Sequence, residues 1–166
     1  MIKVIYGAKG TGKTKQMIDA ANAAVATAKG HLIFITDTKR GMYDLAREIR
    51  FIDVTDFDVA GEAALCGFIK GVIAGNHDNE YVYIDGVMRI AGKPAAELAG
   101  FFYMLDKVAD QNGLTVTVSV SAALSTVSMS KAEAEKAVVT ARAAIRRTLK
   151  KLFFMRMLLS DCFYFH

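Results

Sequence analysis

The fold is decided by Gly7-Ala8-Lys9-Gly10-Thr11-Gly12-Lys13-Thr14, a stretch that matches the phosphate-binding pattern G-x-x-x-x-G-K-[ST] at every defined position. Apolar residues dominate positions 2–6 before it and predict a buried strand, and residues 15–21 after it predict the start of a helix. This pattern indicates a site only when a strand precedes it and a helix follows. The opening of the chain therefore predicts a strand, a glycine-rich loop and a helix in direct succession.

The composition of this loop suits a polyphosphate ligand. Glycines let the backbone curl so that successive N–H groups face one phosphate, and the following helix directs its positive dipole end at the same point. Lys13 adds a charge that can reach the β- and γ-phosphates, and the Thr14 hydroxyl is a ligand for Mg²⁺. We predict that residues 7–14 bind ATP, with GTP as the alternative nucleotide and Mg²⁺ as the cofactor.

Length and composition indicate one globular domain. The chain has 166 residues, of which 53% are apolar and 23% charged, so we expect a single domain over residues 1–166. Cys66 and Cys162 match no metal or redox spacing. Neither a signal peptide nor an uninterrupted apolar stretch of membrane-spanning length is recognisable. These patterns predict a cytoplasmic protein without a membrane span.

The positive charge is concentrated at the end of the chain. Residues 131–166 contain eight Lys or Arg and three Asp or Glu, whereas residues 1–130 contain 13 and 14. A capping box at Ser130 and Glu133 predicts a helix there, followed by an apolar run over residues 152–159. We prefer a solvated helix face as the interpretation; a surface that docks nucleic acid, anionic lipid or a partner subunit is the alternative. The basic residues of this predicted helix are Lys131, Lys136, Arg142, Arg146, Arg147, Lys150 and Lys151.

Strands and helices alternate along the chain, which predicts an α/β fold with a sheet covered on both faces. Residues 114–120 alternate Val with Thr and Ser, a pattern that suits a half-exposed strand, although small hydroxyl side chains also fit a packed sheet. Apolar runs predict the other strands at residues 31–36, 51–54 and 81–84, and helical spacing predicts helices to about residue 29, from about residue 61, and between Pro94 and residue 112.

Asp85 supplies the second half of the predicted site. It ends an apolar run, the form of a Walker B motif, and the carboxyl ends of strands face the ligand in open α/β sheets. Its carboxylate is expected to hold Mg²⁺, directly or through water, opposite Thr14. We therefore predict Thr14 and Asp85 as the metal residues, and Lys13 and Asp85 as the catalytic residues.

With both motifs present, the chain resembles the P-loop NTPase superfamily. Residues 1–121 are similar to small bacterial P-loop proteins described as ATP-binding or, more loosely, as twitching-motility ATPases. The resemblance implies a three-layer sandwich around a mostly parallel sheet of five or slightly more strands, with another strand between the two motif strands. It also implies an ATPase whose hydrolysis is slow or stimulated by a partner, which is a protein or a second copy of the chain.

One feature of hydrolysing members of this superfamily is missing. They usually carry a Glu after the Walker B acid, where this chain has Gly86, and a missing base removes a contribution of about 10²–10⁴-fold. Asp37, Asp53 and Asp56 are candidate substitutes, and the sequence does not choose among them. The other candidate groups near strand ends are Ser119 and Ser121, as sensors of the γ-phosphate, and Arg40 and Arg89, as arginines that stabilise phosphate charge.

Two other functions remain open from the sequence. Residues 7–14, followed by Asp37-Thr38-Lys39-Arg40, are similar to P-loop thymidine kinases, which would make the chain a nucleoside kinase. Gly86 in the place of Glu and the lack of zinc-binding cysteine pairs argue against that similarity. The second alternative is a nucleotide-regulated module that docks a partner or nucleic acid through the basic segment after residue 130.

Overall fold

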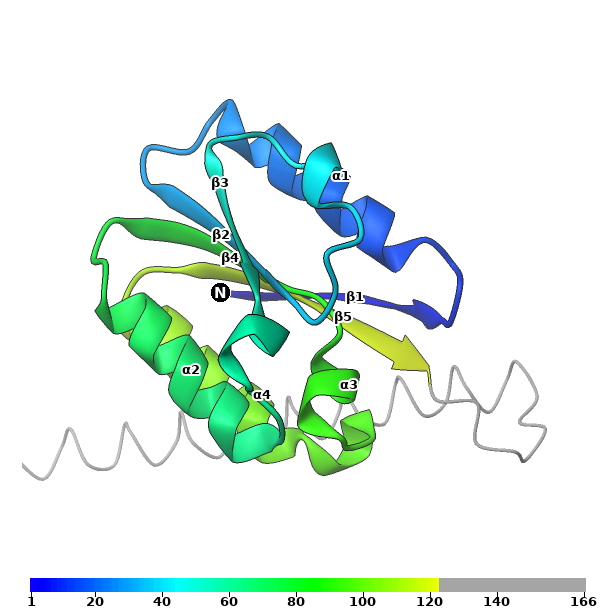
Figure 1. Cartoon of the computed structure of the whole chain (residues 1–166). Coiled ribbons are helices and arrows are strands. Elements are labelled where there is room, and N and C mark those ends of the chain that lie inside the picture. The colour runs from blue at the N-terminus through cyan, green and yellow to red at the C-terminus, as the bar shows by residue number, and fades with distance from the viewer. Residues whose placement is uncertain (123–166) are drawn as a thin grey trace, which may run out of the picture. The chain divides into compact units, whose positions relative to one another are not determined.

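A computed structural model describes residues 1–122 of the chain, which form an α/β structure (Figure 1). The basic helix and the apolar segment expected after residue 130 lie outside the described residues, as does Cys162. In chain order the elements are β1 (Ile2–Ala8), α1 (Lys13–Val25), β2 (His31–Thr36), the 3₁₀ turn η1 (Met42–Asp44), β3 (Ile49–Asp53), the 3₁₀ turn η2 (Val54–Phe57), α2 (Glu62–Ala74), β4 (Asn79–Ile84), α3 (Val87–Ala91), the 3₁₀ turn η3 (Ala95–Glu97), α4 (Ala99–Gln111) and β5 (Thr115–Ala122).

The described strands form one five-stranded sheet in the order β1-β5-β4-β2-β3, and every neighbouring pair is parallel. β5 therefore lies between β1, which leads into the glycine-rich loop, and β4, which ends before Asp85. Parallel pairing brings the carboxyl ends of all the strands to the same edge of the sheet. The predicted loop and the acids at the strand ends consequently share that edge.

Helices cover both faces of the sheet (Figure 1). On one face α1 packs through Met17 against aromatic side chains of the central strands, Phe34 and Tyr83. On the other face α2, α3 and α4 bury a larger apolar cluster in which Leu65 and Phe101 are fully inaccessible. This arrangement confirms the predicted α/β class with helices on both faces of the sheet (Figure 1). The prediction of a buried strand at residues 2–6 is wrong, because β1 lies at the edge of the sheet and none of its residues is buried; Val4 and Tyr6 are 53% and 51% exposed.

The position of β5 settles the ambiguity of its alternating sequence. β5 pairs with β1 on one side and β4 on the other, so it is an interior strand of the sheet. Val116 and Val118 are buried on one face, and Thr117 and Ser119 on the other are only 6% and 5% exposed. The half-exposed interpretation is wrong, because helices cover both faces of the sheet.

Several element ends differ from the sequence prediction. α1 ends at Val25 rather than near residue 29, and β3 begins at Ile49, two residues before the predicted strand. Gly30, immediately before β2, lies against the backbone oxygen of Asp78, where a Cβ would clash. The short helix α3 was not predicted, because five residues are too few for a helical period to be visible in the sequence.

Among the helices of residues 1–122, none has both the length and the apolar character needed to cross a membrane.

Candidate functional site

The glycine-rich loop joins β1 to α1 and depends on glycine at two positions. Gly10 and Gly12 have φ angles of 86° and 76°, in the left-handed region that L-residues rarely adopt. Gly7 is restricted in a different way, because a Cβ there would lie 2.7 Å from Thr11 Oγ1. The backbone therefore turns sharply after β1, and α1 begins at Lys13 with its first amides at the loop.

The amides of this loop are mostly uncommitted within residues 1–122. Thr11 N donates to Ala8 O over a long 3.4 Å, and the described part of the chain provides no acceptor for the amides of Gly10, Gly12, Lys13 and Thr14. Such N–H groups at the start of a helix form an anion-binding arrangement. These loop amides therefore have no acceptor within residues 1–122, as an anion-binding loop requires.

The Lys13 side chain folds back across the start of the loop. Its Nζ donates to Gly7 O at 3.0 Å and to Ala8 O at 2.6 Å, and the residue is 8% exposed. Backbone carbonyls are weaker partners for an ammonium group than anionic oxygens are. A phosphate at the loop would therefore compete well for this charge.

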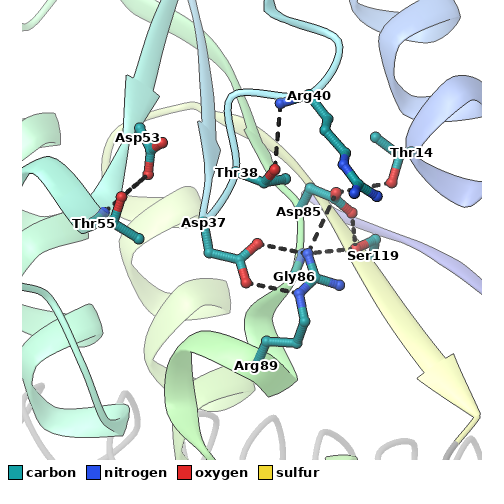
Figure 2. Close-up of polar contacts among 10 residues, drawn as sticks. All are labelled: Thr14, Asp37, Thr38, Arg40, Asp53, Thr55, Asp85, Gly86, Arg89 and Ser119. Atoms are coloured by element: carbon teal, nitrogen blue, oxygen red, sulfur yellow. Dashed lines mark hydrogen bonds and ion pairs between the residues drawn. The ribbon is translucent and has the colours of Figure 1, made fainter.

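Asp85 and Thr14, the two predicted metal residues, are brought together at the edge of the sheet (Figure 2). Thr14 Oγ1 donates to Asp85 Oδ2 at 2.9 Å, and Asp85 is only 3% exposed. Ser119 Oγ donates to the other carboxylate oxygen of Asp85 and accepts from Gly86 N at 3.1 Å. The register of β4 on β5, with Ile84 beside Val118, places Asp85 next to Ser119.

A second acidic group, Asp37, lies beside this pair at the end of β2. Arg89, on the first turn of α3, binds its carboxylate in a bidentate manner, with Nε to Oδ2 at 2.7 Å and Nη2 to Oδ1 at 2.6 Å. The same Nη2 lies 3.9 Å from Asp85 Oδ2, so one guanidinium spans both carboxylates (Figure 2). The hydrogen bond to Asp37 raises the pKa of Arg89 above its ordinary value, which keeps the guanidinium charged.

The remaining predicted acids are committed elsewhere. Asp53 accepts from Thr55 N at 3.0 Å and Thr55 Oγ1 at 2.7 Å, and so it caps the turn η2. Asp56 is exposed and pairs with Lys39 Nζ at 2.9 Å.

Two further candidates lie near the loop without joining the cluster. Arg40 is exposed, and its backbone N donates to Thr38 Oγ1 at 3.3 Å. Ser121 is in register with Gly7 at the end of β1, next to the glycine-rich loop. The structure thus collects Thr14, Asp85 and Ser119 into one hydrogen-bonded group.

Sequence reasoning missed the link between Asp37 and Arg89. Both residues were singled out, but 52 positions separate them and no local pattern pairs them. The signal that could have found the link is topological, because β2 and β4 are neighbours and the residues that follow them must meet. Across residues 1–122, no three His, Cys, Asp or Glu side chains gather in a way that could hold a metal ion. No protein-family model matches this chain, and a search of curated proteins finds no match either.

Proposed function

We propose that this chain is a P-loop nucleotide-binding protein that binds ATP with Mg²⁺ and hydrolyses it slowly or on stimulation by a partner. The observation that carries the proposal is the 2.9 Å hydrogen bond between Thr14 and Asp85, residues 71 positions apart. Each was selected from a different motif as a ligand of the same ion. Parallel pairing brings both motifs to one edge of the sheet, and the hydrogen bond brings these two side chains within reach of a common ligand there.

The geometry of the loop supports a polyphosphate as the ligand. Uncommitted amides at the start of α1 and the ammonium group of Lys13 all belong to one turn of backbone. The positive φ angles of Gly10 and Gly12 disfavour any residue with a Cβ, and a Cβ on Gly7 would clash with Thr11. These positions therefore carry no side chain that would shield the donors. This donor set fits the β- and γ-phosphates of a nucleotide.

The oxygens of Thr14 and Asp85 fit Mg²⁺. The ion prefers hydroxyl and carboxylate oxygens, usually takes one or two from the protein, and completes its shell with phosphates and water. When bound, it would neutralise charge on the β- and γ-phosphates. Asp85 would hold it directly or through water, and Ser119 would fix the carboxylate through the hydrogen bond that already joins them.

The sheet order supports the same assignment. β5 separates the strand before the loop from the strand that ends at Asp85, which is the arrangement implied by the resemblance to ATP-hydrolysing P-loop proteins. Within that arrangement Lys13 would contact the transferred phosphate, and Thr14 and Asp85 would position the metal. The nucleotide base is left unspecified, so ATP is preferred over GTP only as the commoner ligand.

The test is calorimetric titration of the full chain with ATP, GTP, ADP and adenosine, each with and without Mg²⁺. We expect Mg²⁺-dependent binding of the triphosphate and no binding of adenosine. Lys13→Ala should weaken binding by about 100-fold, because it removes a charged hydrogen-bond donor from the phosphates.

Lys15→Ala is the matched control. Lys15 lies two residues further along α1, is 80% exposed at its side chain and, among residues 1–122, pairs with Asp19. Equal affinity of the wild type and Lys13→Ala for ATP would contradict the proposal. Transfer of phosphate to thymidine in the same preparation would favour the nucleoside kinase alternative instead.

A further inference from the structure

We propose that Asp37 is the residue that orients the attacking water in ATP hydrolysis, in the place of the Glu that usually follows the Walker B acid. This assignment rests on the proposed function. The sequence left three acids as candidates, and the geometry of the described residues points to one of them.

Asp37 lies in the space beside Gly86. A Cβ built on Gly86 would lie 2.6 Å from Asp37 Oδ1 and would also clash with Arg89 Nη2. The Asp37 carboxylate and the Arg89 guanidinium together occupy the space where a side chain at position 86 would begin. An acid missing at position 86 is thus accompanied by an acid that follows the neighbouring strand β2 and lies directly beside that position.

The other acids that could take this role already have hydrogen-bond or ion-pair partners. Asp53 uses one carboxylate oxygen to cap η2, and Asp56 forms an exposed ion pair with Lys39. Both oxygens of Asp85 accept hydrogen bonds, from Thr14 and Ser119, and it is the proposed metal residue. Asp37 is the acid of this group that adjoins the metal pair without belonging to it.

The Asp37 carboxylate can still accept a hydrogen bond from water. An ionised carboxylate has about four lone-pair positions, and Arg89 occupies two of those on Asp37. The Asp37 side chain is 17% exposed, so water reaches it. The planar fork of Arg89 fixes the carboxylate in one orientation, which makes Arg89 a positioning residue.

In the proposed step, water attacks the γ-phosphate of ATP. The water oxygen forms a bond to the γ-phosphorus while it donates one hydrogen bond to Asp37. The bond between the γ-phosphorus and the β,γ-bridging oxygen breaks, and its electron pair stays on that oxygen, which becomes terminal in ADP. The water proton passes to an oxygen of the released phosphate. Asp37 orients the water and does not need to keep the proton, so its pairing with Arg89 is compatible with the role.

The decisive experiment is steady-state ATP hydrolysis by Asp37→Ala, with ATP affinity measured by calorimetry on the same preparation. We expect kcat to fall by about 100-fold, the lower end for a positioned acid–base group, while affinity for Mg²⁺-ATP changes by less than about threefold. Asp56→Ala is the matched control, since it also removes an acid paired with a cation, and it should keep wild-type kcat. If Asp37→Ala melts below the assay temperature, Asp37→Asn is measured in its place, with an expected loss of about tenfold because the amide oxygen still accepts from water.

A rescue experiment separates this role from a structural one. Gly86 is in the left-handed region, with φ 77°, which Asp tolerates better than most residues. Asp37→Ala removes one of the two side chains that a Cβ at position 86 would meet, and the other, the flexible end of the Arg89 side chain, has to move aside. Asp37→Ala combined with Gly86→Asp should regain at least about tenfold in kcat over Asp37→Ala alone. Arg89→Lys should lower kcat with little change in affinity, because a lysine cannot form the bidentate fork.

The outcomes distinguish this inference from the proposed function. If the wild type does not bind ATP, the proposed function fails and the inference falls with it. If the wild type binds ATP but shows no turnover, or if Asp37→Ala keeps kcat within threefold of the wild type, the inference alone is overturned. A folded double variant with no gain over Asp37→Ala also overturns it.

Discussion

The glycine-rich loop and the carboxylate cluster meet at one edge of the sheet but are built in opposite ways. The loop is a single stretch, residues 7–14, and its working groups are mostly backbone amides set by two left-handed glycines. The cluster of Asp37, Asp85, Arg89 and Ser119 comes from three separate parts of the chain, and its working groups are side chains. Local backbone conformation determines the structure of the loop, whereas the order of the strands brings the residues of the cluster together.

This difference teaches where each region is vulnerable. The loop tolerates changes of side chain at positions that point outward, but not a Cβ where the backbone must be left-handed. The cluster depends on the pairing of β4 with β5 and with β2, because a slip of one residue would turn each side chain to the other face of the sheet. Substitutions in the loop should therefore act through backbone conformation, and substitutions in the cluster should act through contacts between side chains.

The largest effect is expected from Gly12→Val in the loop. A β-branched residue at φ 76° costs about 1–3 kcal/mol, so either the loop rearranges or α1 begins elsewhere. We expect ATP affinity to fall by about 100-fold in calorimetry and the melting temperature to fall by several degrees because of the strain. Lys9→Ala, in the same loop at an exposed position, is the control and should bind ATP within about twofold of the wild type. If Gly12→Val bound normally, the idea that backbone conformation determines this region would be wrong.

A smaller and more specific effect is expected from Asp85→Asn. The amide has the shape of the carboxylate but no charge, so it should weaken Mg²⁺ binding by about tenfold while leaving the loop amides intact. The measurement is the ratio of ATP affinity with Mg²⁺ to that without it. We expect this ratio to approach one. An equal loss of affinity in both conditions would mean that Asp85 supports the fold of the site rather than the metal.

Ser119→Ala should affect stability more than binding. Its hydroxyl is buried, donates to Asp85 and accepts from Gly86 N, so its removal leaves a buried N–H without its partner. We expect the free energy of unfolding to fall by about 1 kcal/mol in urea denaturation. Ser121→Ala lies two residues along the same strand and should change stability by less than about 0.5 kcal/mol. Equal effects of the two substitutions would show that the hydroxyl of Ser119 contributes nothing specific to the cluster.

The same difference in construction explains how much could be predicted from the sequence. The loop, its flanking strand and helix, and the acid at the end of β4 follow from local patterns, and so do the α/β class and the approximate bounds of the long helices. Thr14 and Asp85 were expected to lie opposite each other, and they do form a hydrogen bond, while their role as metal residues stays a prediction. The short helix α3 was not predicted, and a strand between the two motif strands was expected without being identified as β5, since neither feature leaves a period in the sequence that distinguishes it.

The contact between Asp37 and Arg89 shows why the rest of the site could not be predicted from the sequence. Each residue is an ordinary polar side chain after a strand, and only the order β4-β2 brings them together. The choice among Asp37, Asp53 and Asp56 depended on a volume, the space beside Gly86, which no pattern of residue types encodes. Sequence therefore identifies groups that act through local backbone, and tertiary structure identifies those that act through neighbours.

The smallest effect is expected at the opposite end of the sheet, where Glu80 makes a contact of the same long-range kind as the cluster. Its Oε2 accepts from Lys29 N and Gly30 N, both at 2.8 Å, and these bonds lower the pKa of Glu80 below its ordinary value of 4.5. A carboxyl whose pKa is lower in the folded state stabilises the protein above the unfolded pKa and loses that contribution as pH falls through the folded value.

Glu80→Gln should therefore lower the melting temperature slightly at pH 7 and should not change it once the pH is below the folded pKa of Glu80. Thermal melts of both proteins across this range provide the measurement, and ATP affinity at pH 7 should be unchanged because the contact is remote from the loop. A difference in melting temperature that persisted at low pH would assign the effect to side-chain packing, and altered ATP affinity would show that the two ends of the sheet are coupled.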